Sequence, residues 1–383
     1  MAKRGSRSVV PAARFVQLTV LLLCLGSVAA AAQVVRAVTV KPPDAVLAEE
    51  FTAVSSIREL ENGRVLLTDR REQRALVVDF RTGQVSPFAR RGHGPGEYGS
   101  PPQIFQLAGD SSLLVARTQR RWLLLHGGMV VSTLPPDAPA IVQTQASIIG
   151  TDSLGRVLTT KAPQARPGVT VVSTRDSLEL VLVDRNSGTS DTVARLRRMA
   201  SRSSLTLDAQ GREKESSFDR PGVMSTEETA AIFPDGAVAI ARLDPFRIDW
   251  RFANGSWIRG DSLPVRPVAL DARQKQWYMR AIAGDAAPQP PETLSGWPAT
   301  IPPFLSTISP LTAASDGRLL VRRSRDADHN GTRYLIVNRR GQLDGEISLA
   351  PNISIVGVGR RSLYTTATDS DGIQRLQRHP WPN

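Results

Sequence analysis

The sequence contains little cysteine, histidine or aromatic side chain. Its 383 residues include one cysteine, four histidines and 5% aromatic residues. Cys24 has no partner for an internal disulfide, and Leu23 precedes it where a bacterial lipoprotein signal has a small residue. None of the histidines stands in an HxH or HExxH pair. The sequence therefore gives no basis for a disulfide framework, a lipid anchor or a zinc enzyme.

Positive charge is plentiful but not clustered. Lys and Arg total 48 against 36 acidic residues, only five of the 48 are lysines, and arginines occur in every segment. Without the first 32 residues, which hold four basic residues and no acid, the formal net charge falls from +12 to about +8. A nucleic-acid-binding face shows clustered charge and a recognisable motif, and neither is present. We therefore expect no nucleic-acid partner.

The first 32 residues have the order of a secretory signal peptide. A basic segment (1–15) is followed by an apolar run (16–25) and a segment of small residues (26–32). The apolar run is about half of the roughly 20 residues that span a bilayer, and no other segment is long and apolar enough. The sequence predicts an exported protein, periplasmic or extracellular, with no transmembrane segment once the signal is removed.

After residue 50, one β pattern recurs, in which an apolar strand and a glycine turn precede further strands of alternating pattern. The turn glycines are separated by 46, 46, 81 and 81 positions: Gly63, Gly109, Gly155, Gly236 and Gly317. A repeat of about 40 to 50 residues with four strands predicts a β-propeller. The two long spacings then hold insertions, at about 195–224 and 264–303, the second with a helix-like stretch at Asp271–Ala283.

The chain ends predict how the ring closes. The last repeat offers only three strands, and residues 34–40 (VVRAVTV) form an unpaired strand at the other end. Placed on the last blade, this strand would close the ring and hide an edge that invites aggregation. The sequence therefore predicts an all-β fold, a six-bladed β-propeller of four-stranded antiparallel blades over residues 33–383, as a single domain and a monomer. Seven blades, with a further unit within 160–230, are the alternative.

The first repeat carries a phrase that points to a family. Thr68-Asp69 ends one strand, Arg74 opens the next (RALVVDF), and a glycine-rich turn at 91–98 (RGHGPGEY) comes before two prolines. At these residues the sequence resembles the NHL-like six-bladed β-propellers, including exported bacterial proteins of this fold. The resemblance implies the architecture for about residues 34–379. It leaves the activity open, because this scaffold hosts binding modules, lyases and lactonases.

Long connections are expected on one face of the ring. In a four-stranded meander, the connections from the second to the third strand and from each blade to the next share one face, which we call the loop face. On it fall the turn at 92–98, both insertions, and residues 161–176 and 325–331. Loops gathered on one side suggest a binding side. The alternative is that insertions lie where surface loops tolerate them.

The turn at 92–98 offers His93, Glu97 and Tyr98 as candidate binding residues. It matches GxGxxG, but prolines follow where a dinucleotide site has a helix, so no such site is predicted. The alternative is that the glycines shape the return of the chain to the axis, with Tyr98 packed between blades and Glu97 capping locally.

The helix-like insertion offers Trp277, Tyr278 and Arg280 as further candidates. Aromatic side chains over the mouth of a propeller can contact a glycan or a peptide. The alternative is that Trp277 packs the insertion onto the blades.

Asp326, Asp328 and Asn330 match the D-x-D-x-N-G opening of a calcium loop. The twelfth position is Val337 instead of the bidentate Glu, and a plain turn prefers the same residue types. Calcium is therefore an optional ligand, and we expect no other cofactor.

These features favour a non-enzymatic binding module for a protein, a peptide or an envelope glycan, bound over the loop face. The alternative is a calcium-dependent enzyme of the lactonase or lyase type. It requires at least three carboxylate or amide side chains from different blades at one point on the propeller axis. A scaffold within a larger complex is a third possibility, and it predicts an extensive exposed apolar patch.

Overall fold

The structure is a computed structural model that describes residues 1, 35–99, 103–116, 121–134, 148–161, 170–207, 213–218, 223–283, 286–305 and 310–382. The chain divides into two units, Met1–Val34 and Val35–Asn383. The expected signal peptide falls in the first unit, of which only the first residue is described, so it stays a prediction. All that follows concerns the second unit.

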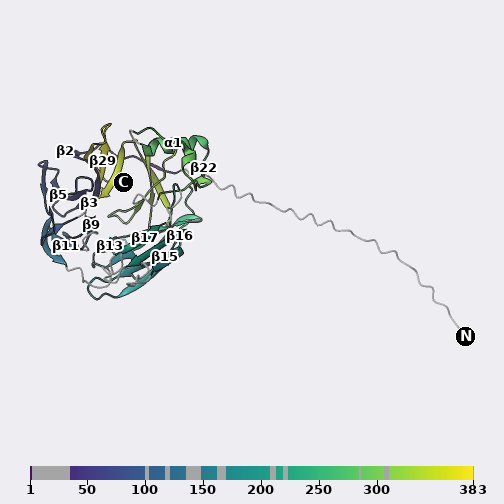
Figure 1. Ribbon diagram of the computed structural model, residues 1–383, viewed down its shortest axis with the longest axis horizontal. Coiled ribbons are helices and arrows are strands. Elements are labelled where there is room, and N and C mark those ends of the chain that lie inside the picture. The colour runs from purple at the N-terminus through teal and green to yellow at the C-terminus, as the bar shows by residue number, and fades with distance from the viewer. Residues whose placement is uncertain are drawn as a thin grey trace. The chain divides into compact units, whose positions relative to one another are not determined.

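Six sheets form the blades of a ring (Figure 1), and their strands pair antiparallel except for β1 in blade 5. Blade 1 contains β3 (Val54–Glu59), β4 (Val65–Asp69), β5 (Arg74–Asp79) and β6 (Gln84–Pro87), and blade 2 contains β9 (Gln103–Gln106), β10 (Ser111–Ala116), β11 (Arg121–His126) and β12 (Met129–Leu134). Blade 3 contains β13 (Ile148–Thr151), β14 (Val157–Thr160), β15 (Thr170–Val183), β16 (Ser190–Leu207) and β17 (Glu213–Phe218).

The second half of the ring has the same plan. Blade 4 contains β18 (Thr229–Ile232), β19 (Val238–Leu243), β20 (Phe246–Arg251) and β21 (Trp257–Ile258). Blade 5 contains β24 (Leu311–Ala313), β25 (Leu319–Arg322), β26 (Thr332–Val337), β27 (Leu343–Leu349) and β1 (Ala37–Val38). Blade 6 contains β28 (Ile353–Val358), β29 (Ser362–Thr368), β30 (Gln374–Pro380) and β2 (Ala45–Phe51).

The innermost strand of each blade contacts those of its two neighbours around the axis. These strands are β3, β9, β13, β18, β24 and β28, and contact between β28 and β3 closes the circle. Apolar clusters fill the space between successive sheets. The six-bladed propeller is therefore confirmed. The seven-bladed alternative is wrong, because the described residues form six such sheets and the ring is already closed.

An N-terminal strand closes the last blade, as predicted, but it is not the expected segment. Strand β2 pairs antiparallel with β30. In the segment 34–40, which was expected in that place, β1 pairs parallel with β27 and becomes the fifth strand of blade 5. The assignment of 34–40 was therefore wrong, although the count of six survives because β2 takes the closing position.

The sequence of β2 explains the error. Its pattern AVLAEEF is less apolar than VVRAVTV, and Glu49 and Glu50 interrupt it. Only Leu47 and Phe51 are deeply buried, at 2% and 1% exposure. They pack with Tyr364 and other side chains of blades 1 and 6. This strand is selected by two well-placed anchors and not by its mean hydropathy.

Asp69, at the end of β4, binds the backbone of the connection between β2 and β3 through hydrogen bonds. Its buried carboxylate accepts hydrogen bonds from the backbone N–H of Thr52 at 2.7 Å and of Ala53 at 3.2 Å. It also accepts from Arg71 at 3.0 Å and Glu72 at 3.1 Å. Burial by itself raises the pKa of Asp69, but the backbone hydrogen bonds, led by that from Thr52, outweigh it and hold the pKa below its usual value.

The five spaced glycines all lie in turns between the first and second strands of their blades. Their φ angles are between 54° and 88°, in the left-handed region that disfavours any residue with a side chain. The spacing that predicts the propeller thus reflects a backbone requirement that recurs in each of the first five blades.

A segment expected as a loop, 161–176, and the insertion expected at about 195–224 are largely strand where they are described. Residues 170–176 and 195–207 belong to the long hairpin of β15 and β16, and 213–218 form β17. The expectation of a loop at 161–176 was wrong over 170–176, because runs such as TVVST and SSLTL have high β propensity and pair with each other across the hairpin. The insertion at 195–224 stays a prediction, and its described residues are strands of this sheet.

The insertion after blade 4 contains the helix expected at Asp271–Ala283. Strands β22 (Val268–Ala269) and β23 (Thr300–Ile301) pair at its base, with α1 (Ala272–Ala283) and a short 3-10 turn, η2 (Pro291–Thr293), between them. No helix among the described residues is long and apolar enough to cross a membrane.

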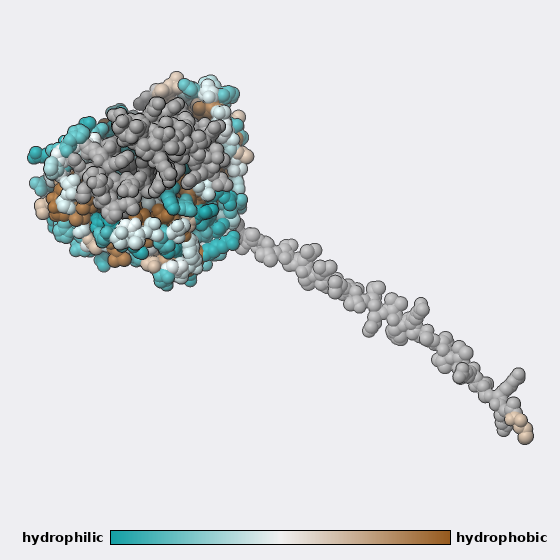
Figure 2. Space-filling view, turned by 60° about the horizontal axis from the view of Figure 1, so that its bottom comes forward, coloured by the Kyte–Doolittle hydropathy of each residue, from teal (hydrophilic) through white to brown (hydrophobic). Residues whose placement is uncertain are grey.

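The described surface is mostly hydrophilic in the view of Figure 2, with separate apolar patches. The exposed large apolar side chains of the ring are dispersed over several blades: Val46, Met129, Val131, Leu154, Trp257 and Ile282. Within the described part of the chain, these residues do not form the extensive patch that the scaffold hypothesis requires.

Candidate functional site

Helix α1 is tied to the loop that follows β25. Asp271 caps the helix, because its Oδ1 accepts a hydrogen bond from the backbone N–H of Gln274 at 2.9 Å. The buried Gln274 side chain accepts from Ala327 N at 2.8 Å and donates to Asp328 Oδ2 at 3.0 Å. Arg273 forms an ion pair with Asp328. The helix is therefore held against blade 5 by both backbone and side-chain partners.

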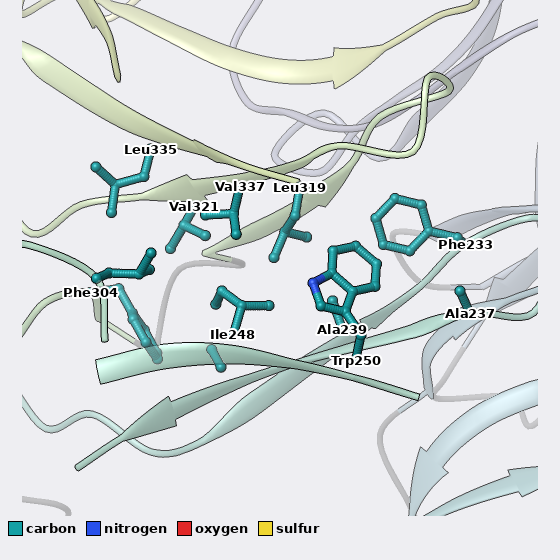
Figure 3. Close-up of a cluster of buried hydrophobic side chains, with 12 residues drawn as sticks. Phe233, Ala237, Ala239, Ile248, Trp250, Phe304, Leu319, Val321, Leu335 and Val337 are labelled. Carbon is teal, nitrogen blue, oxygen red and sulfur yellow. The ribbon is translucent and has the colours of Figure 1, made fainter. Parts of the chain in front are cut away.

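The return of the insertion is built into the core between blades 4 and 5. Phe304 is fully buried there (Figure 3), and its ring centroid lies 5.9 Å from that of Phe246. It belongs to the same cluster as Trp250. The backbone N–H of Ser324 donates to the carbonyl of Pro303 at 3.0 Å. Both ends of the segment around α1 are thus fixed to the propeller.

An aromatic contact fixes the side of α1 that faces its own insertion. The Tyr278 ring meets the Trp297 ring edge-on, with centroids 5.6 Å apart. Lys275 lies over the Trp297 ring at 5.8 Å, and Trp297 Nε1 donates to the carbonyl of Pro291 at 3.1 Å. Tyr278 is therefore held by Trp297, which is itself fixed by Lys275 and by the carbonyl of Pro291.

A pocket of about 280 Å³ opens between α1 and blade 5, on the loop face. One wall is apolar and comes mainly from the helix: Trp277, Tyr278, Ala281, Ile282, Met224, Leu305 and Pro310. The other wall is the segment Arg322-Arg323-Ser324-Arg325 at the end of β25. No acidic side chain is among these lining residues. The volume lies just below the range of about 300–1,000 Å³ that is typical of small-molecule sites.

Arg325 joins the two walls. Its guanidinium lies 5.7 Å from the centroid of the Trp277 ring, and its Nη2 donates to the carbonyl of Asn330 at 3.1 Å. Burial, together with the neighbouring charge of Arg322, lowers the pKa of Arg325. Among the residues that the structure describes, the Arg322 guanidinium has no hydrogen-bond or ion-pair partner. Two cations therefore face the pocket without a carboxylate.

Three consecutive residues of this wall have buried polar atoms with no hydrogen-bond partner in the described protein. They are Nε of Arg323, Oγ of Ser324 and Nε of Arg325. Arg323 does reach Glu346, through Nη1 at 3.2 Å. Buried polar atoms without partners are uncommon, and a run of three marks a place where a bound group can supply acceptors.

Two of the three candidates in α1 line this pocket. Trp277 and Tyr278 do so, and the contact between Trp277 and Arg325 also packs the insertion onto blade 5, as the packing alternative states. Arg280 is exposed and is not among the lining residues.

The candidates in the turn at 92–98 lie elsewhere, beside blades 1 and 2. There β7 (Arg90–Arg91) pairs in parallel with β8 (Glu97–Tyr98). Tyr98 is 2% exposed and donates to the carbonyl of Gln73 at 2.9 Å, and burial raises its pKa. Glu97 Oε2 accepts from Gly94 N at 2.7 Å, and His93 is exposed. Tyr98 and Glu97 therefore have the packing and capping contacts of the structural alternative.

The carboxylates of the proposed calcium loop are occupied by cations and amides. Asp326 Oδ2 accepts from Arg333 at 2.6 Å, and its Oδ1 accepts from His329 Nδ1 at 2.9 Å. Burial raises the pKa of Asp326, but the hydrogen bond from His329 and the charge of Arg333 outweigh it, so the pKa is lowered. Asp328 is held by α1, and the Asn330 carbonyl is turned to Arg325. Among the described residues, no three His, Cys, Asp or Glu side chains gather as a metal site.

A second cavity, of about 480 Å³, lies on the propeller axis. Its charged residues are Arg58, Glu59, Asp110 and Arg360, at the end of the channel opposite the loop face. Burial lowers the pKa of Arg58 to about 10, and its guanidinium donates to the carbonyl of Leu107. Glu59 accepts from Tyr364 Oη at 2.7 Å. Among the described lining residues, the two carboxylates, Glu59 and Asp110, come from blades 1 and 2 alone.

The arginine wall is the part of the site that sequence reasoning missed. Arginines were interpreted as scattered, although Arg322-Arg323-Ser324-Arg325 places three of them in four positions directly before the Asp/Asn-rich loop. The available signal was this short run at the loop-face end of a strand, beside an insertion with several aromatic residues. It required knowing that the insertion folds over that strand.

No family model matches the chain, and no curated protein matches it. Solved structures match over most of its length. A member of the DUF4221 family from Bacteroides vulgatus has 8% identity and a TM-score of 0.46, covering 89% of this chain and 97% of its own. Virginiamycin B lyase from Staphylococcus aureus, a catalytically inactive variant with quinupristin, has 10% identity and a TM-score of 0.39, and the match covers 87% of this chain and 97% of the lyase. A gluconolactonase from Xanthomonas campestris has 11% identity and a TM-score of 0.41, and the match covers 90% of this chain and 94% of the gluconolactonase. Likeness this weak carries no argument about the chemistry of this chain, and NHL-family membership stays a resemblance.

Proposed function

We propose that this protein is an exported β-propeller that binds a peptide segment, free or part of a protein, on its loop face and without catalysis. The observation that carries the proposal is the pocket between α1 and blade 5, where an aromatic and aliphatic wall faces three arginines. Such a site combines an apolar receptacle with a few polar groups that can orient a ligand.

The residues of the pocket favour a peptide over a glycan. Sugar hydroxyls need acceptors as well as donors, and the lining residues that the structure describes include no carboxylate or amide side chain. An apolar side chain of a peptide, in contrast, can be buried against Trp277, Tyr278 and Ile282. No observation favours the calcium-dependent enzyme, so we propose no reaction.

The position of the pocket also supports a binding role. It lies on a rigid base, because α1 is fixed through Gln274 and the return of the insertion is fixed through Phe304. A preformed site loses less conformational freedom on binding than a mobile loop does.

A random-peptide display library selected on the purified protein tests this proposal. Enriched peptides should bind the wild type and lose at least about tenfold in affinity with Ala281→Trp, in which an indole fills the pocket. Ala272→Trp, at an exposed position of the same helix outside the pocket, is the matched control and should bind normally. Peptides that bind Ala281→Trp as well as the wild type, or a selection that enriches none, would overturn the proposal.

A further inference from the structure

The backbone of the arginine wall is rigidly placed. The backbone N–H groups of three successive residues, Arg322, Arg323 and Ser324, each donate to a carbonyl of another segment. The acceptors and distances are Pro310 at 2.7 Å, Arg333 at 2.9 Å and Pro303 at 3.0 Å. The side chains that follow from this backbone are therefore held at the pocket by three separate strands and loops.

The acidic groups that the structure describes near this wall already have partners. Glu346 pairs with Arg323, Asp326 with Arg333, and Asp328 with α1. Arg322 and Arg325 are left without a carboxylate in the described part of the chain. Because two neighbouring cations repel each other in a partly buried site, an anion placed between them is attracted by both.

The donors that remain suit a carboxylate. A carboxylate can accept two parallel N–H bonds from one guanidinium, and charge-assisted bonds of this kind are about twice as strong as neutral ones. Arg325 keeps a buried Nε donor without a partner, and the adjacent Ser324 hydroxyl is likewise unpartnered among the described residues. Both would gain an acceptor from an anion bound at this wall.

The apolar wall of the pocket, opposite the arginines, favours an anion that also carries an apolar group. Trp277, Tyr278 and Ile282 lie across the pocket from the arginines and present aromatic and branched aliphatic surface. A volume of about 280 Å³ accommodates one side chain together with a carboxylate, and not a long polymer. Inorganic phosphate would satisfy the cations and leave this apolar surface uncovered.

We propose that the pocket recognises an apolar carboxylate, in which the anionic group and an aromatic or branched aliphatic group belong to one residue. A peptide that ends in such a residue has this chemistry, and so does a small aryl or alkyl acid. The inference rests on the proposed function of the loop face and adds the chemical class of the group that enters the pocket.

Isothermal titration calorimetry with matched probes tests the inference. The probes are N-acetyl-phenylalanine, its C-terminal amide, the peptide acetyl-Gly-Gly-Gly-Phe as acid and as amide, and inorganic phosphate. At neutral pH both acids should bind at least about tenfold more tightly than their amides and than phosphate. Arg322→Gln and Arg325→Gln should each weaken acid binding by about tenfold and so reduce the ratio of acid affinity to amide affinity. Arg280→Gln, an exposed arginine on α1 outside the pocket, is the control and should change neither.

The source of the ligand follows from the two acids. If the peptide acid binds at least about tenfold more tightly than N-acetyl-phenylalanine, the natural ligand is a peptide terminus, and if they bind equally, it is a small acid. Both results support the inference. Acid and amide that bind within about threefold of each other, or acids that do not bind at millimolar concentration, would overturn it. The proposed function would still stand if display-selected peptides lose binding with Ala281→Trp, so the two failures are distinguishable.

Discussion

The closure of the ring by β2 makes a quantitative prediction. Phe51 is 1% exposed, packs with side chains of blades 1 and 6, and has the Arg74 guanidinium 5.6 Å from its ring centroid. Truncating a buried Phe to Ala costs about 3–5 kcal/mol through lost transfer free energy and the cavity left behind. With an m value of about 3 kcal/mol/M in urea, Phe51→Ala should lower the unfolding midpoint by roughly 1–1.7 M.

The control for this prediction lies on the same strand. Val46 is 52% exposed, so Val46→Ala should change the free energy of unfolding by no more than about 0.5 kcal/mol. Urea unfolding followed by the fluorescence of the six tryptophans measures both variants. If the midpoint of Phe51→Ala lay within about 0.3 M of that of Val46→Ala, β2 would not be part of the cooperative ring, and the reasoning on closure would be refuted.

Three further predictions concern charges and hydrogen bonds. Because the pKa of Asp69 is lower in the folded protein, its contribution to stability is present above the unfolded pKa of about 3.9 and is lost as the pH falls through the folded value. The urea midpoint of the wild type should therefore fall more steeply with decreasing pH in this acid range than the midpoint of Asp69→Asn. If the midpoints of the two proteins changed in parallel with pH, the stabilising role of the Asp69 carboxylate would be contradicted. Gln274→Ala should speed proteolysis of the α1 insertion with little change in the urea midpoint, while Gln276→Ala, an exposed position on the same helix, should not; equal cleavage of both variants would contradict the docking. Millimolar calcium followed by EDTA should leave the Tm unchanged in calorimetry, because the Asp326 and Asp328 carboxylates are already paired; a rise of several degrees on adding calcium would support the metal-dependent alternative.

The architecture was predictable because its signals are local and repeated. A glycine with positive φ recurs at Gly63 and at its four counterparts, one in each of the first five blades, and this backbone requirement is visible as a sequence spacing. The helix in the insertion was predictable for a similar reason, since Asp271 caps it and no proline interrupts the stretch. Signals of this kind do not depend on which segments meet in space.

The errors arose where the outcome depends on tertiary contacts. Residues 34–40 look like the better strand, but Leu47 and Phe51 of β2 fill the space that blade 6 offers. The pocket likewise joins α1 to a strand that begins some 40 residues later, and Arg322 and Arg325 gain significance only when Trp277 lies beside them. Neither pairing follows from the sequence pattern of one segment.

A crystal structure of the protein with a display-selected peptide most directly tests whether the pocket between α1 and blade 5 is the ligand site. The account predicts that the terminal residue of the peptide places its side chain against Trp277 and Tyr278 and its carboxylate within hydrogen-bond distance of Arg322 or Arg325. A peptide bound in the axial channel beside Arg58, or anywhere outside the loop face, would contradict it.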